Sequence, residues 1–171
     1  LDPYFLNNLV FHLGLIESLS YWKATCSPQI DIQAGALTPE QTDWWRELIL
    51  TGLGEFFYHH HINFTSPDFV HLISCTTGHF QAQEVTVQPT QFLTLVSGGK
   101  DSAVALEIIK NNQQALLLNP TPAALEISKI AGIDHPVIVE RSIDPRLLAL
   151  NQQGYLNGHT PFSAYLAFLS L

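Results

Sequence analysis

Hydrophobic residues recur every three or four positions over residues 4–24, which is the spacing of an amphipathic helix. A second helix is predicted over residues 38–60, where Thr38 is suited to the N-cap and a proline follows it. Gly52 and Gly54 are expected to interrupt this helix. Short apolar or alternating runs predict three strands, at QIDI after the first helix, at 69–75 and at 82–89. Residues 1–90 are therefore expected to form a smaller α+β region, a candidate substrate-side domain, with its topology left open.

The pattern becomes regular after residue 90, where short apolar strands alternate with short helices. The predicted elements are a strand at 92–97, a helix from about Ser102, a strand at 114–120, a helix at 121–132 and a strand at 136–143. In the first of these helices Val104 with Ile108 and Ala105 with Ile109 are predicted to form the apolar stripe. Alternation of this kind implies right-handed crossovers and a parallel sheet. Residues 91–171 thus predict the N-terminal part of an α/β nucleotide-binding domain. The apolar run at the C-terminus suggests that the chain is a piece of a longer one, truncated within this domain.

Composition narrows the classes of partner. The 171 residues include 7 Lys and Arg against 15 Asp and Glu, giving a formal charge of −8. Because nucleic-acid affinity comes largely from basic side chains on phosphates, a nucleic-acid partner is not expected. No apolar stretch is long enough to span a membrane, and no signal peptide is visible. Two distant cysteines predict reduced thiols and a cytoplasmic location. The oligomeric state is not indicated.

The most informative stretch is SGGKDS, residues 97–102, between a predicted strand and a predicted helix. Ligands of parallel sheets bind at the carboxyl ends of the strands, where this loop falls. Gly98 and Gly99 let the backbone approach a ligand, and the helix directs free N–H groups to the same place. Lys100 adds a positive charge, while Ser97 and Ser102 add hydroxyl donors. The loop predicts a polyphosphate site, with a tight βαβ turn as the structural alternative.

Asp101 needs a separate explanation, because a carboxylate beside a triphosphate is repelled. A Mg²⁺ ion that bridges the carboxylate and the phosphates removes this conflict, so Asp101 is the predicted metal ligand. The stretch does not match a Walker A loop, which needs Ser or Thr directly after the lysine. It resembles instead the SGGxDS signature of the PP-loop ATP pyrophosphatases.

A second polar cluster, GYLNGHTPFSA, occupies residues 154–164 and reads as a loop that enters a helix. We expect it to face the same cleft as the glycine loop. Asn157 or His159 is suited to bind an anion, orient a carbonyl group or move a proton. The alternative is an N-cap arrangement with a satisfied histidine. Glu55, in an otherwise apolar helix, is interpreted as part of a solvated face, and the three consecutive histidines at 59–61 as surface groups rather than metal ligands.

Several segments together resemble the UDP-N-acetylmuramoyl-L-alanyl-L-glutamate epimerase family of peptidoglycan synthesis. They are LVSGGKDSAVALEIIK, LLLNPTPAALEISKIAGI and SIDPRLLALNQQGYLNGHTPFSAYLAFL, covering about residues 92–171. The resemblance implies a PP-loop fold with ATP and Mg²⁺ as cofactors. It also implies epimerisation of the terminal L-Glu of UDP-MurNAc-L-Ala-L-Glu, through an acyl-adenylate, with release of AMP and pyrophosphate.

On this resemblance residues 97–102 would hold the ATP phosphates, and Asn119 would approach the nucleoside. Lys100, Asn157 and His159 are the candidate catalytic residues, with substrate contact and proton transfer both open for the last two. Two alternatives are kept. One is another adenylate-forming PP-loop enzyme that forms an amide or transfers sulfur. The other is an ATP-binding module without catalysis.

Overall fold

The computed structural model describes residues 2–80 and 90–171, and contacts divide these residues into two compact units. Unit 1 contains residues 2–80 together with residues 144–169, and unit 2 contains residues 90–143. This division differs from the predicted boundary near residue 90, because the chain returns to unit 1 after unit 2. Unit 1 is also the larger of the two, whereas a smaller N-terminal region was predicted. Both units contain parallel strand pairs accompanied by helices, which confirms the α/β class in outline.

Unit 1 is built from five helices and two strands in the described residues. They are α1 (Pro3–Trp22), β1 (Gln29–Ile32), α2 (Pro39–Gly52), α3 (Gly54–His59), β2 (His71–Ser74), α6 (Pro145–Gln152) and α7 (Phe162–Leu169). Strands β1 and β2 pair in parallel, with Ile30 opposite Leu72. The predicted break in the 38–60 helix is confirmed, since α2 ends at Gly52 and α3 begins at Gly54. The strand predicted at 82–89 lies outside the described residues.

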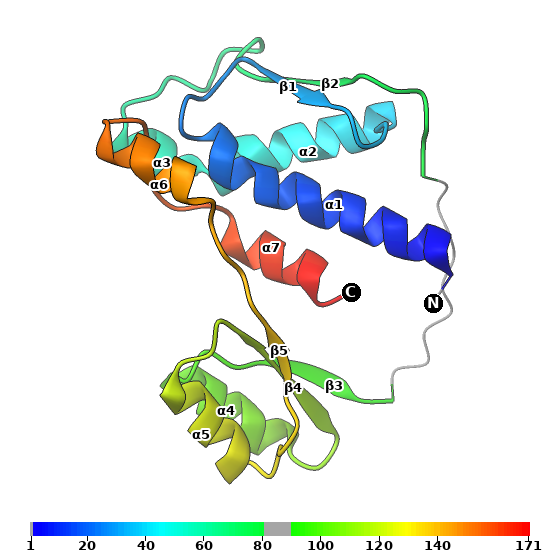
Figure 1. The fold of residues 1–171 in the computed structure, drawn as a ribbon, viewed down its shortest axis with the longest axis vertical. Helices are drawn as coiled ribbons and strands as arrows, with labels where there is room; N and C mark the ends of the chain where they lie inside the picture. The colour runs from blue at the N-terminus through cyan, green and yellow to red at the C-terminus, as the bar shows by residue number, and fades with distance from the viewer. Residues whose placement is uncertain (1, 81–89) are drawn as a thin grey trace. The chain divides into compact units, whose positions relative to one another are not determined.

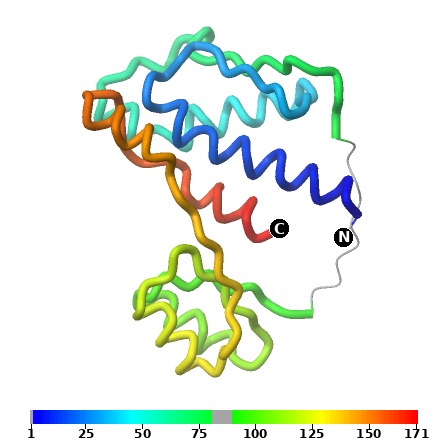
Figure 2. The backbone as a smooth tube through the Cα atoms, in the orientation of Figure 1, coloured from blue at the N-terminus to red at the C-terminus, as the bar shows by residue number. Residues whose placement is uncertain are grey.

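In unit 1, α1, α2 and α6 each start where a local side chain accepts a hydrogen bond from the first turn. Thr38 and Gln41 form a reciprocal capping box on α2, in which each side chain accepts a hydrogen bond from the other's backbone N–H, at 3.2 Å and 2.9 Å. Helix α7 packs on α1, so the red end of the chain runs beside its blue beginning (Figure 2). The fully buried side chains of this unit include Leu19, Trp45, Ile49, Phe56 and Phe57.

Unit 2 is a three-stranded parallel sheet with two helices. Its elements are β3 (Phe92–Leu95), α4 (Lys100–Ile109), β4 (Gln113–Leu118), α5 (Pro122–Ile130) and β5 (Val137–Val139), with strand order β3-β4-β5. Both helices lie on the same face of the sheet (Figure 1). The core between the helices and the sheet contains Val96, Leu106, Ala115, Leu117, Ala124 and Ile133.

The buried face of α4 differs in part from the prediction, since Ala105 and Ile109 are half-buried but Val104 and Ile108 are exposed. Leu106 is 2% exposed and Ser102 is 6% exposed, whereas Val104 and Ile108 are 56% and 77% exposed. The helix also begins at Lys100 rather than near Ser102. Two apolar stripes run along this short helix, and the sheet beneath it covers only the one that contains Leu106.

Candidate functional site

The predicted phosphate loop lies at the carboxyl edge of the unit 2 sheet. Strand β3 ends at Leu95 and α4 begins at Lys100, so residues 96–99 form the turn between them. The two serines close this turn, because Ser102 Oγ accepts a hydrogen bond from the backbone N–H of Ser97 at 3.0 Å and lies 3.1 Å from Ser97 Oγ. Ser102 is buried. Its hydroxyl therefore shapes the loop from inside, rather than facing solvent as a free donor.

Gly98 is required by the fold. Its φ of +89° lies in the region that favours glycine, and a Cβ there would be 2.8 Å from Ala124 N and 3.1 Å from Thr121 Oγ1. Both contacts are in the first turn of α5 or its N-cap. Gly98 thus allows the loop to lie directly against the start of the next helix.

Gly99 has no such requirement. Its φ and ψ of −89° and 177° suit any residue, and an added Cβ would meet only Ser97 Oγ, at 3.8 Å. Gly99 is the N-cap of α4, yet no side chain caps this helix start. Since the first backbone N–H groups of a helix have no partners within it, those of α4 are left available to an anion, together with the positive end of the helix dipole.

Lys100 and Asp101 occupy the first turn of α4 and are both exposed. Within the described residues neither side chain makes a hydrogen bond or an ion pair. A single exposed carboxylate suits Mg²⁺, which commonly takes one or two protein carboxylates together with phosphate oxygens and water. The described residues include no group of three or more His, Cys, Asp or Glu side chains arranged to hold a metal ion by themselves. A Mg²⁺ ion held by Asp101 together with a nucleotide stays a prediction.

A polar cavity of about 700 Å³ lies at the same edge of the sheet, beyond the ends of β4 and β5. It is lined by Asn119, Pro120, Ile138, Glu140, Arg141 and Ser142. Asn119 adopts a φ of +45°, and its amide donates to Arg141 O at 2.7 Å and accepts from Arg141 N at 2.8 Å. The amide thus joins the end of β4 to the segment after β5. A contact between Asn119 and a nucleoside stays a prediction, and the cavity that it lines has room for one.

Asn157 and His159 belong to unit 1, whereas the glycine loop belongs to unit 2. The structure groups these two residues with α3: His159 Nδ1 lies 3.8 Å from Glu55 Oε2, and His60 Nε2 donates to Asn157 O at 2.7 Å. Both side chains are exposed. This grouping does not test the predicted cleft shared by the two loops. The sequence analysis did not predict that His159 lies close to Glu55, because that proximity depends on long-range packing.

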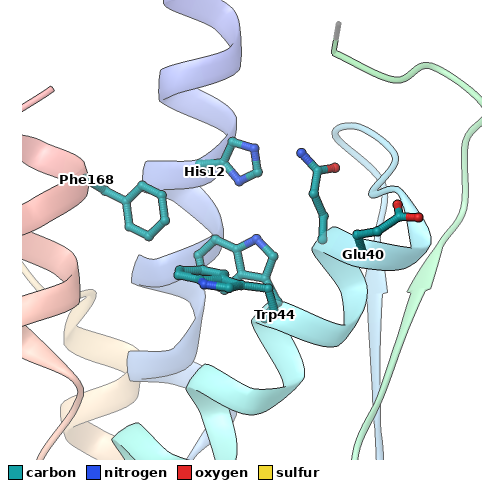
Figure 3. Close-up of a pocket in the computed structure, with 6 residues that line it drawn as sticks. His12, Glu40, Trp44 and Phe168 are labelled. Carbon is teal, nitrogen blue, oxygen red and sulfur yellow. The ribbon is translucent and has the colours of Figure 1, made fainter. Parts of the chain in front are cut away.

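Unit 1 also contains an aromatic cavity of about 350 Å³ between α1, α2 and α7, which the sequence did not reveal. Its lining residues are His12, Glu40, Gln41, Trp44, Trp45 and Phe168 (Figure 3). The rings of Trp45 and Phe168 stack at 5.2 Å, and Trp44 stands nearly perpendicular to both.

Two titratable groups at this cavity have shifted pKa values. Burial lowers the pKa of His12. The pKa of Glu40 is lowered by a hydrogen bond from its own backbone and by a second one from the Thr38 side chain. The walls of the cavity are mostly aromatic, and the lowered pKa of Glu40 favours its negatively charged form. The cavity is therefore poorly suited to a phosphate.

Among the helices of the described residues, none combines the length and hydrophobicity needed to cross a membrane.

Comparison with known proteins places the chain in a family. A protein named UDP-N-acetyl-alpha-D-muramoyl-L-alanyl-L-glutamate epimerase, from Xanthomonas oryzae pv. oryzae (strain MAFF 311018), is 28% identical over 156 residues, which are 89% of this chain and 34% of that protein. A protein of the same name from Salinispora tropica (strain ATCC BAA-916 / DSM 44818 / JCM 13857 / NBRC 105044 / CNB-440) is 28% identical over 172 residues, 93% of this chain and 35% of its own length. A third from Micromonospora sp. (strain ATCC 39149 / NRRL 15099 / SCC 1413) is 33% identical over 82 residues, 46% of this chain and 18% of that protein.

The chain spans about a third of the length of the relatives from Xanthomonas and Salinispora. No solved structure matches it. The profile of the MurL N-terminal domain family matches residues 4–171, which is nearly the whole chain. The resemblance drawn from the glycine loop and from the polar cluster at residues 154–164 is thereby confirmed, and the chain belongs to the MurL N-terminal domain family.

Proposed function

We propose that this chain is part of an enzyme that epimerises the terminal L-Glu of UDP-MurNAc-L-Ala-L-Glu to D-Glu, using ATP, in the synthesis of peptidoglycan precursors. Two findings support the proposal: the names of the relatives from Xanthomonas and Salinispora, and the glycine loop of unit 2. The observation on which ATP use depends most is Gly99, a glycine that the fold does not require, in front of an uncapped helix start. A phosphate that approaches the backbone closely explains both features.

The chemistry explains why an epimerase would need ATP. A proton next to an ionised carboxylate is hard to remove, because the resulting carbanion lies beside a negative charge. In the proposed reaction a carboxylate oxygen of the substrate attacks the α-phosphorus of ATP, and pyrophosphate leaves. The mixed anhydride that forms is neutral at the carbonyl group, so its Cα–H is more acidic. A base removes this proton, it is returned to the opposite face, and water then releases AMP.

The residues of unit 2 have distinct tasks in this scheme. The free N–H groups at the start of α4 and the Lys100 ammonium bind the phosphates and stabilise the charge on the departing pyrophosphate. Asp101 would hold Mg²⁺, whose charge offsets that of the phosphates. Ser97, Gly98 and Ser102 keep the loop in shape. The polar cavity lined by Asn119 is the proposed nucleoside site.

Asn157 and His159 are the proposed substrate-contacting residues of unit 1. We also propose a cytoplasmic location, where ATP and nucleotide-linked precursors occur; Cys26 and Cys75 are free thiols. Neither a nucleic acid nor a membrane is proposed as a partner.

The test is incubation of the complete protein with ATP, Mg²⁺ and UDP-MurNAc-L-Ala-L-Glu in deuterated water. Formation of AMP, pyrophosphate and D-Glu that carries deuterium at Cα supports the proposal. AMP formed only with a different acceptor would favour another adenylate-forming enzyme, and ATP binding without turnover would favour a binding module.

Lys100→Ala and Asp101→Asn provide the matching variants. Both should reduce pyrophosphate release by at least about a hundredfold, since they remove charges that act on the phosphates. Circular dichroism should be unchanged, because both side chains are exposed. Turnover at the wild-type rate in both variants would remove the loop from the mechanism.

A further inference from the structure

In the polar cluster at residues 154–164, the backbone of residues 156–158 is held by side chains from other parts of unit 1. Three consecutive carbonyl groups each accept a hydrogen bond: Leu156 O from Asn151 Nδ2 at 3.1 Å, Asn157 O from His60 Nε2 at 2.7 Å, and Gly158 O from Lys23 Nζ. Lys23 is only 6% exposed. A buried ammonium group is unfavourable unless it is paired, so its bond to Gly158 is a strong constraint on the loop.

The same loop lies directly against α3. A Cβ on Gly158 would be 2.9 Å from Phe56 Cδ2, so only glycine permits this approach. With its carbonyl groups engaged and Gly158 in contact with Phe56, the loop has a defined backbone. The side chains of Asn157 and His159 remain exposed on it, which is the arrangement expected when a loop presents polar groups to a ligand.

Glu55 lies at the centre of the exposed groups. Its Oε2 is 3.8 Å from His159 Nδ1, and its Oε1 is 3.6 Å from His59 Nε2, so each carboxylate oxygen faces a different imidazole ring. The other titratable groups nearby are His60 and Lys23, and both donate to carbonyl groups of the loop. Among the described residues, Glu55 therefore supplies the carboxylate beside His159.

We infer that Glu55 is a positioning residue for His159, and that His159 is the unit 1 group that exchanges the α-proton in the proposed reaction. This inference rests on the proposed function. A carboxylate beside Nδ1 orients the ring with Nε2 toward the substrate and stabilises the imidazolium that forms when Nε2 takes the proton. In that step the Cα–H bond breaks, an N–H bond forms, and the electron pair stays on the activated substrate.

The first test is the split between kcat and KM in turnover by the complete protein. Glu55→Gln should lower kcat by about tenfold to a hundredfold, with the KM for ATP unchanged, because the carboxylate acts through the His159 ring and not on the nucleotide. Glu55→Asp should recover part of the rate. His59→Gln is the matched control, since it removes the ring on the other carboxylate oxygen and should keep the wild-type kcat.

The second test does not depend on turnover. In NMR spectra of the complete protein, the ring resonances of His159 should move in Glu55→Gln and stay in place in His59→Gln, because Glu55 is the carboxylate beside His159. An active wild type with the same kcat and the same His159 ring resonances in Glu55→Gln would overturn the inference while leaving the proposed function intact. A wild-type protein that never forms AMP would instead overturn the proposed function.

Discussion

Two adjacent glycines in the loop before α4 are glycine for different reasons. Gly98 has a positive φ and touches the first turn of α5, so Gly98→Ala should destabilise unit 2 by about 1–3 kcal/mol. Gly99 is an N-cap in an extended conformation, for which serine is a better residue.

Gly99→Ser should therefore raise stability by a few tenths of a kcal/mol and yet weaken ATP binding by about tenfold or more. The new hydroxyl would occupy the N–H groups that the phosphates need, and its Cβ would stand in their path. Thermal unfolding and an ATP titration of the same variant measure the two effects. Unchanged ATP affinity would show that phosphate does not bind at this helix start.

His12 makes the stability of unit 1 depend on pH. Burial holds its pKa below the ordinary value, so the unfolded chain binds a proton more readily than the folded one. Stability is thus retained above about pH 6.5, the ordinary pKa of histidine, and is lost as the pH falls below it.

The variant His12→Phe keeps an aromatic ring against Trp45 and removes the titration. Between pH 7.5 and 5.5 the melting temperature of the wild type should fall further than that of this variant. Parallel decreases would mean that His12 does not contribute.

At the scale of elements, helix starts were the most predictable feature, because capping is local. Thr38 was expected to be an N-cap, and its side chain accepts the backbone N–H of Gln41. Thr121 caps α5 in the same way, since its side chain accepts the backbone N–H of Ala124. Helix α6 was missed although Asp144 and Pro145 form the same kind of signal, with Asp144 Oδ1 accepting from Arg146 N at 2.8 Å.

The buried face of α4 was predicted only in part, because it depends on the sheet beneath the helix. Leu106→Ala should cost about 2–5 kcal/mol in unfolding free energy, since Leu106 is in the unit 2 core. Ile108→Ala should cost no more than about 0.5 kcal/mol, because Ile108 is 77% exposed. Urea unfolding followed by circular dichroism compares the two. Equal losses would mean that the stripe containing Ile108 is also buried in solution.

At the scale of the whole molecule, the sequence did not predict which segments make up unit 1, namely residues 2–80 and 144–169. The glycine loop was found from six consecutive residues, because its chemistry is local. The pairing of Glu55 with His159 depends instead on how residues 144–169 pack on α1 and α3, and no short-range pattern encodes that.

Removal of residues after 143 should therefore disrupt unit 1. Phe168, which stacks on Trp45 and meets Trp44 edge-on at 6.0 Å, would be lost from the aromatic cavity. Tryptophan fluorescence should shift to longer wavelength, because all three tryptophans belong to unit 1. An unshifted spectrum would show that residues 2–80 keep their packing without α7.

The return of the chain to unit 1 has a consequence for biosynthesis. A ribosome synthesises residues 90–143 before it adds the segment that becomes α6 and α7. The nascent chain can close the β3–β5 sheet while α1 still lacks the helix that packs on it. The part made first would then be the last to mature, and its apolar helix faces would be the ones that a chaperone meets during translation.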